Sequence, residues 1–427
     1  MRKLLFILFS TVSVYADTSF EEIVSKVVNN HPSINMLNEG LKSAKEGTEN
    51  AKWQYYPTPS IDFSRSSNGL QSTAKLEQPL WTAGKLDANY KQALLGEQEA
   101  VFTLEEKKYQ LIEIIISYIQ NYIQAKLTKE ALIDGIKRLD NFTEMIDRRI
   151  SAGVSSSSDK RLLESRLTQI KSDLISSENK EKTALKQISL LTGEEINEIN
   201  FIDNINLENI SLEELVSKTV EFHPSIYKLD EKIEIAIYEI DKQESSLYPT
   251  LTLNAEHTRG SLYDESNEKN NSIYFKLQSQ FGAGLSSLSN INQAKIEVQK
   301  LKYEKKTLEN DLIDGFWQDY NNLTIANNKI KNYMVSKKLA EEVFQSNERL
   351  FLADKKQWLD LVNSSKEVMD IDISIADSKV MFIIGKYKIG LRTGLIDLDN
   401  GTFSKSSIQS KKNNNNFDFL FNDKGFN

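Results

Sequence analysis

Two segments of the chain, 192 positions apart, are nearly copies of each other. Residues 19–34 read SFEEIVSKVVNNHPSI and residues 211–226 read SLEELVSKTVEFHPSI, and the two agree at 11 of 16 positions. The agreement resumes at the same offset, where residues 56–58 and 248–250 both read YPT. Solenoid repeats have much shorter periods, of roughly 20–50 residues. The long period therefore indicates an internal duplication, and we expect the same series of elements in each half of the chain.

The first 16 residues have the character of a secretory signal peptide. Arg2 and Lys3 form a basic start, residues 4–14 are apolar, and the sequence VYA at residues 14–16 resembles a cleavage site. The apolar run is far shorter than the roughly 20 residues that a membrane-spanning helix needs. We therefore expect export and cleavage rather than a membrane anchor.

The composition narrows the classes of chemistry and partner. The formal net charge of −8 disfavours nucleic acid as a partner, because phosphate binding needs clustered Lys and Arg. There is no cysteine, which excludes disulfides and thiol catalysis. The three histidines are scattered, and no phosphate loop or zinc spacing is present, so the sequence predicts no catalytic, metal or cofactor site. His31 and His223 are instead predicted to lie at helix junctions, each before a proline.

Hydrophobic periodicity predicts a mainly helical chain that contains two pairs of strands. Apolar residues at period two predict strands within 58–82 and 249–282, and the chain has no later run of 18 apolar residues. The first long helix, over residues 83–150, would extend for about 100 Å, too long for an ordinary globular domain. The predicted division is listed here: signal peptide 1–16, first-half helices 17–57, strand pair 58–82, long helical hairpin 83–192, linker and second-half helices 193–248, strand pair 249–282, second long hairpin 283–396, and disordered tail 397–427.

Aromatic residues flank the strand pairs: Trp53, Tyr55, Tyr56, Trp81 and Tyr248. In a soluble hairpin such residues belong to the core. In an outer-membrane barrel, Trp and Tyr gather where the apolar band meets water. The aromatic positions alone leave both interpretations open, because the alternating strands of a membrane barrel leave little trace in hydropathy.

Several short motifs resemble the TolC family of outer-membrane channels, over about residues 19–396. Residues 77–85 read EQPLWTAGK, which is similar to the family's QPLWxGGK segment. Residues 281–288 read FGAGLSSL, which resembles the GAGLSS segment of members that serve type I secretion, adhesin export especially. The RTGL of residues 392–395 resembles the end of the family's last helix.

The resemblance implies a homotrimer in the outer membrane of a Gram-negative bacterium. Each protomer would contribute four strands to a twelve-stranded β-barrel in contact with outer-membrane lipid, and its helices to a hollow α-barrel in the periplasm. The implied partners are a periplasmic adaptor (membrane fusion protein) and an inner-membrane ABC or proton-driven transporter. Closure by three copies would also remove the exposed strand edges that lipid does not tolerate.

The resemblance also implies roles for the two helical tips that meet the adaptor. Gly153 matches the family's turn glycine, and Asp159 matches its aspartate. Residues 351–363 read FLADKKQWLDLVN and resemble FLAGKRSWLDVLN, so Asp354, followed by Lys355 and Lys356, replaces the second turn glycine. Aspartate tolerates the left-handed conformation better than most residues, and we expect the turn to survive. The implied inter-helix tie joins Asp159 to Lys356, and should be looser than one with Arg.

Two further positions match the family's pore gate. Asp360 falls on the pore-constricting aspartate, and Asn363, one helical turn later, falls on a second gate position where Asp also occurs. Three copies of Asp360 would form an acidic ring that selects cations. A neutral second ring implies weaker block by multivalent cations. The alternative for Asp360 is a solvated carboxylate on a helix face.

The sequence thus favours a trimeric export channel, with type I protein secretion as the expected role. A multidrug or metal efflux channel is the alternative within the family. An elongated periplasmic adaptor or coiled-coil scaffold is the alternative of another class, and it leaves the two strand pairs unexplained. No residue identifies the cargo.

Overall fold

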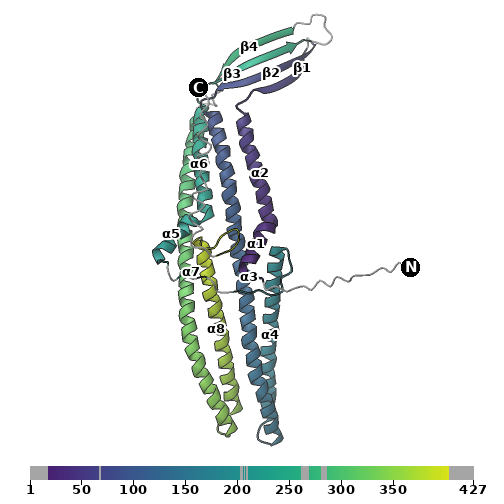
Figure 1. Cartoon of the computed structure of the whole chain (residues 1–427), viewed down its shortest axis with the longest axis vertical. Helices are drawn as coiled ribbons and strands as arrows, with labels where there is room; N and C mark the ends of the chain where they lie inside the picture. Colours follow the sequence, from purple (N-terminus) through teal and green to yellow (C-terminus); the bar gives the residue numbers. More distant parts are fainter. Residues whose placement is uncertain are drawn as a thin grey trace, which may run out of the picture. The chain divides into compact units, whose positions relative to one another are not determined.

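The computed structural model describes residues 18–66, 69–201, 205, 207, 210–260, 269–279 and 286–402 (Figure 1). The predicted signal peptide, residues 281–285 of the GAGLSS-like motif and residues 403–427 of the predicted tail lie outside the described residues. Residues 397–402, which were predicted to belong to the disordered tail, are instead ordered: Leu398 is buried, and the Asp397 N–H donates to the Thr402 carbonyl at 2.9 Å. Within the described part, none of the helices combines the length and apolar character needed to cross a membrane.

The chain divides into two compact units, each assembled from segments of both halves. One unit consists of the described residues of Met1–His31, Lys108–Lys218 and Gly315–Asn427. The second unit consists of the described residues of Pro32–Lys107 and Thr219–Asp314. Each unit is described by itself below.

The second unit contains one four-stranded antiparallel sheet in the order β1-β2-β3-β4 (Figure 1). Its strands are β1 (Thr58–Ser66), β2 (Gly69–Trp81), β3 (Thr250–Arg259) and β4 (Lys269–Gln278). Strands β2 and β3 pair directly, so the hairpins of the two halves join edge to edge. Helix α2 (Pro32–Trp53) leads into the first hairpin, and α6 (Pro224–Ser245) leads into the second.

The first unit is built from long helices. It contains α1 (Phe20–Asn30), α4 (Ser157–Thr192) and α8 (Trp358–Arg392), together with parts of α3 (Lys85–Ser151), α5 (Leu212–Phe222) and α7 (Ser286–Leu352). Helices α3 and α7 each contain 67 residues. The two halves therefore repeat one series of elements, and the predicted duplication is confirmed.

Short-range chemistry fixes the helix junctions of the repeat. Ser19 caps α1 by accepting a hydrogen bond at 3.2 Å from the backbone N–H of Glu22, as its spacing predicts. Helix α1 ends before His31, and α2 begins at Pro32. In the second half, His223 is the N-cap of α6, where its Nδ1 accepts from the N–H of Ser225 at 3.3 Å. His31 is the C-cap of α1, so the predicted helix-junction role is confirmed for both histidines.

An apolar core runs between the ends of the four long helices of the first unit. Most of its residues follow one another at steps of three, four or seven positions, so one stripe of each helix faces the others. The buried members are Leu132, Leu139, Phe142, Ile146, Leu163, Leu167, Ile170, Phe351, Leu361, Val362 and Met369. This core holds the two helical tips together, and the candidate site lies on its surface.

Candidate functional site

Each of the two helical hairpins of the first unit ends in the same kind of turn. Gly153 has a φ of 75°, and Asp354 has a φ of 61°, both in the left-handed region. In both turns, the residue that follows donates a 2.9 Å hydrogen bond back to the preceding helix, from Val154 to Arg149 and from Lys355 to Leu350. The prediction that Asp354 preserves the turn is confirmed.

The two residues expected to tie the tips together have other partners. Asp159 belongs to the capping box of α4, where its Oδ2 accepts from the N–H of Ser156 at 3.2 Å. Lys356 Nζ lies 3.6 Å from Oδ2 of Asp360, one turn along the same segment. Both Asp159 and Lys356 line a cleft of about 520 Å³ between the tips. The ion pair across this cleft joins Arg149 to Asp354 instead.

Arg149 is the functional candidate that the sequence did not reveal. Its Nη2 pairs with Asp354, its guanidinium lies 4.8 Å from the centre of the Phe351 ring, and its Nε donates to Ser155 Oγ at 3.4 Å. One side chain of α3 therefore contacts both turns. The only sequence signal is a basic residue in the last turn of a helix, which is common because it complements the helix dipole.

A different ion pair fixes the first tip internally. Lys160 Nζ of α4 lies 2.6 Å from Asp147 Oδ1 of α3, within one hairpin. The hydrogen bond to Asp147 raises the pKa of the Lys160 ammonium. This pair joins the two helices of one tip and does not reach the other tip.

The expected gate residues lie on the exposed side of α8. Asn363 is exposed and Asp360 is half-buried, while their neighbours Leu361 and Val362 belong to the core. The same stripe continues at helical spacing through Glu367, Asp370, Ser374 and Asp377. Glu367, Asp370 and Asp377 were not singled out from the sequence, although the three- and four-residue steps from Asp360 give their positions.

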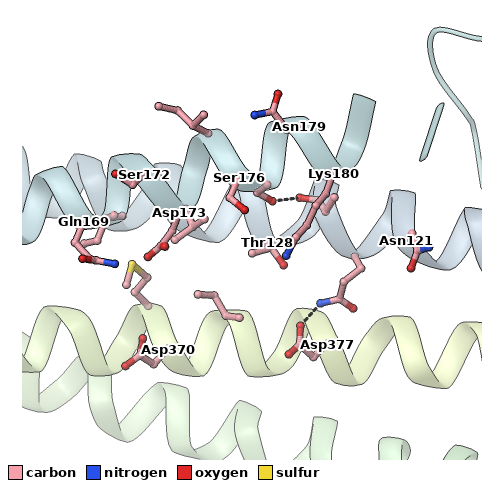
Figure 2. A pocket seen from close by; sticks show the side chains of 18 of the residues that line it. Asn121, Thr128, Gln169, Ser172, Asp173, Ser176, Asn179, Lys180, Asp370 and Asp377 are labelled. Atoms are coloured by element: carbon pink, nitrogen blue, oxygen red, sulfur yellow. Dashed lines mark hydrogen bonds between the residues drawn. The ribbon is translucent and has the colours of Figure 1, made fainter. Parts of the chain in front are cut away.

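A groove of about 1230 Å³ separates the α3–α4 hairpin from α8 (Figure 2). Its floor is apolar, with Leu132, Ile170 and Met369, and its rim is polar. The residues Asp360, Asn363, Glu367, Asp370, Ser374 and Asp377 of α8 are called the acidic stripe below. Asp377 accepts a hydrogen bond from Gln124 of α3 across the groove. The groove therefore borders the stripe and contains solvent-facing amides, hydroxyls and charges of both signs.

Further along the helices, ion pairs fix α8 between its neighbours. Asp372 of α8 lies 2.7 Å from Lys337 Nζ of α7 and 3.6 Å from Arg138 Nη2 of α3. The hydrogen bond to Asp372 raises the pKa of Lys337. Arg392 Nε at the end of α8 donates to Asp319 of α7 at 2.6 Å. These ion pairs fix the part of α8 that lies far from the tips.

The sheet of the second unit has two faces of opposite character. Cross-strand partners share a face, and Ile61, Ile273 and Phe275 project from one face with 68%, 77% and 69% of their surface exposed. The other face carries polar residues, which are Asp62, Lys75, Glu77, Asn254, Glu256 and Lys276. Lys75 pairs with Glu77 at 2.5 Å, and the Tyr274 hydroxyl donates to Glu256 at 2.7 Å. Large apolar residues are thus exposed together on one face of the sheet, which is unusual for a soluble sheet.

Aromatic residues lie at the ends of the strands that adjoin the helices. Trp53, Tyr56, Trp81 and Tyr248 are exposed, and the Trp53 and Tyr56 rings are 5.2 Å apart. Tyr55 differs, because its hydroxyl donates to Asp87 of α3 at 2.6 Å. Four of the five predicted aromatics therefore present their rings to the surroundings of the protomer.

Within the part of the chain that the structure describes, no group of three or more His, Asp or Glu residues could hold a metal ion.

Comparison with known proteins identifies the fold. No protein-family model matches the sequence. The chain is 24% identical over 320 residues to the protease secretion protein PrtF of Dickeya chrysanthemi, covering 71% of this chain and 68% of that protein. The structure resembles CusC with a TM-score of 0.77 at 11% identity, covering 89% and 92% of the two chains. It also resembles the outer-membrane protein VceC of Vibrio cholerae, with a TM-score of 0.75 at 13% identity and coverage of 90% and 97%.

Proposed function

From its fold, which is that of the TolC family of outer-membrane channels, we propose that the chain forms a trimeric duct across the outer membrane and the periplasm. One observation carries the proposal. One face of the sheet exposes large apolar side chains, among them Ile61, Ile273 and Phe275, and the other face carries charged residues such as Lys75 and Glu77. Such a sheet suits lipid on one side and water on the other.

The unpaired edges of the sheet support a shared barrel. Among the residues that the structure describes, β1 and β4 are the outermost strands of the sheet, so each has one row of backbone groups without a strand partner there. Lipid does not satisfy such groups, and a closed barrel does. Four strands from each of three copies close the barrel, with Trp53, Tyr56, Trp81 and Tyr248 at its periplasmic interface.

Apolar side chains on the helices support lateral assembly as well. Ile175 and Leu190 of α4, and Val335 and Leu339 of α7, are exposed in the single protomer. A ring of neighbouring copies covers such stripes. The acidic stripe of α8 then faces the lumen, with Asp360 at the gate and Asn363 beside it.

The proposed partners are a periplasmic adaptor, which contacts the tips at Gly153, Asp354, Lys355 and Lys356, and an inner-membrane transporter. The likeness to a protease secretion protein supports type I protein export as the role. The fold fits multidrug or metal efflux equally. Expression in a strain that lacks its own channel distinguishes the roles, because export restores a secreted protein whereas efflux restores growth on a toxic small molecule.

The structures that the chain resembles are channels, which supports transport over catalysis, and the amphipathic sheet argues against a periplasmic scaffold. The test is single-channel recording in planar bilayers with the detergent-extracted protein. We expect small cation-selective openings, lower cation selectivity for Asp360→Asn, and stronger block by multivalent cations for the reciprocal variant Asn363→Asp. A pore that is indifferent to both substitutions refutes the gate assignment. Absence of any pore refutes the channel.

A further inference from the structure

The strongest unassigned feature of the molecule is the distribution of charge over the two faces of its sheet. The acidic residues of the four strands are Asp62, Glu77 and Glu256, and all of them lie on the face proposed to line water. The face that exposes Ile61 and the other large apolar residues has no acidic residue at any described strand position. The two faces therefore differ in the sign of their charges as well as in polarity.

Two arginines lie on the apolar face, and both are at the same end of it. Arg65 follows Ile61 by four positions on β1, so the two residues share a face. Arg259 of β3 is on that face as well, because Ser72 pairs in register with Arg259 on one side and with Phe63 on the other. Helices α2 and α6 lead into the opposite ends of these two strands (Figure 1). The face therefore changes from apolar to basic with distance from the helices.

Neither arginine has a partner for its charge in the part of the chain that the structure describes. Both side chains are exposed, and neither guanidinium forms an ion pair or a hydrogen bond there. The register partner of Arg259 on β4 is Lys269, so a third basic residue is placed at this end of the face. The nearest residue with a polar contact on the same face is His257, whose Nδ1 lies 2.6 Å from Oδ1 of Asn271. Arg65 and Arg259, called the basic patch below, thus present positive charge to whatever surrounds the sheet.

The position of Arg259 along its strand fits the level of lipid headgroups. It lies eight positions beyond Leu251, at the start of the same strand. At about 3.3 Å per residue and a strand tilt of about 40°, that separation is roughly 20 Å along the membrane normal. The apolar band of a membrane barrel is about 25 Å tall, and an arginine facing lipid is costly at its centre and nearly neutral at its edge. In a barrel, Arg259 therefore lies at the edge of the band that is farther from the helices.

We propose that the basic patch binds the phosphate groups of an anionic lipid in the outer leaflet around the barrel. The inference rests on the proposed channel function, because a barrel places this face of the sheet against lipid. A guanidinium pairs with phosphate oxygens through two parallel hydrogen bonds, which a lysine ammonium cannot form. Arg65 and Arg259 are two strands and two residues apart, on the order of 12 Å. A lipid that carries two phosphate groups therefore fits the patch better than a single phosphate does.

Thermal unfolding of the full-length protein in detergent tests the patch, with a bisphosphorylated lipid A as the probe. A lipid that binds the folded protein raises its melting temperature, and the dependence on lipid concentration gives the affinity. Arg65→Gln and Arg259→Gln should each weaken binding about fivefold. The double variant should weaken it about 25-fold, because the two residues are far enough apart for their effects to add. Lys276→Gln is the matched control and should leave binding unchanged, because Lys276 is an exposed basic residue on the opposite face of the same sheet.

A second measurement uses the natural protein alone and so does not depend on the folding of any variant. Lipid A without its phosphates should raise the melting temperature much less than the bisphosphorylated form does. An equal rise means that the acyl chains alone bind, and it overturns the proposal. Inorganic phosphate should neither raise the melting temperature nor displace the lipid at the same concentration. If it does both, the patch is a site for free phosphate, which also overturns the proposal.

The lipid site and the channel fail in different ways. Arginine variants that bind the bisphosphorylated lipid as tightly as the natural protein does overturn the lipid site. If the same preparation still conducts in a planar bilayer, the channel proposal is unaffected by that result. A natural protein that forms no pore refutes the channel, and the lipid site falls with it. Replacement of both arginines by lysine should give an intermediate affinity, because the charge remains and the paired hydrogen bonds are lost.

Discussion

The two helical tips have the same backbone and different chemistry. Each ends a long helix with a left-handed residue and the same return hydrogen bonds. In the first tip that residue is Gly153, and the Lys160–Asp147 pair closes the hairpin internally. In the second tip that residue is Asp354, which forms an ion pair with Arg149 of the first tip.

The difference shows how one copy of a duplicated turn gains a contact that the other copy lacks. Glycine meets the backbone requirement at no steric cost but offers no side chain. Aspartate meets it at some cost and presents a carboxylate to a neighbour. The first tip therefore has an ion pair of its own, whereas Asp354 of the second tip has its partner in the first.

The largest loss of stability is expected when the apolar core that the two tips share is damaged. Leu163 of the first tip and Leu361 of the second are 0% and 1% exposed in one apolar cluster. Leu163→Ala and Leu361→Ala should each destabilise the protein by about 3 kcal/mol, because both leave a cavity. Thermal unfolding of the detergent-solubilised protein, followed by circular dichroism, measures the loss. If one variant unfolds much earlier than the other, the tips have separate cores.

A smaller effect is expected at the turn glycine of the first tip. Gly153→Ala meets no atom within 4 Å, so its whole cost is the left-handed φ, about 1 kcal/mol. Gly96→Ala is the control, because this glycine lies in the interior of α3 with open space around it. Alanine there should stabilise the helix by roughly 0.5–1 kcal/mol. Equal shifts of the melting temperature in both variants would mean that φ is not the determinant.

Much of the tip structure could be predicted from the sequence. The apolar residues recur at helical spacing, and Gly153 with the serines that follow it marks a turn and a helix start. The left-handed conformation of Asp354 also follows from its alignment with a glycine. These features depend on residues close together in the chain, and local spacing therefore predicts them.

The partner of Asp354 could not be predicted in this way. Arg149 is 205 positions away, and nothing in its neighbourhood distinguishes it from Arg148 beside it. The choice depends on which side of α3 faces the second tip, which the packing of four helices decides. Asp159 and Lys356 show the converse, because local hydrogen bonds and charges engage both of them before they can reach across the cleft.

Asp354→Gly makes the second tip resemble the first. The substitution removes the left-handed strain, a gain of about 1 kcal/mol, and loses an exposed ion pair, a cost of about 0.5 kcal/mol. The melting temperature should therefore change little, whereas Asp354→Asn, which only loses the charge, should melt slightly lower. If Asp354→Gly lowers the melting temperature more than Asp354→Asn does, the backbone at residue 354 is not strained.

The smallest effect is expected for the internal pair of the first tip. The hydrogen bond to Asp147 raises the pKa of Lys160 in the folded state, so its contribution is complete below the unfolded value of about 10.4 and is lost as the pH rises through the folded pKa. Lys160→Gln should thus melt slightly below the natural protein at neutral pH, and the two should converge in alkaline buffer. Melting curves at several pH values measure the difference. Because the pair is partly exposed and lies within one hairpin, a large loss of stability would mean that the first tip, like the second, depends on a charge for its position.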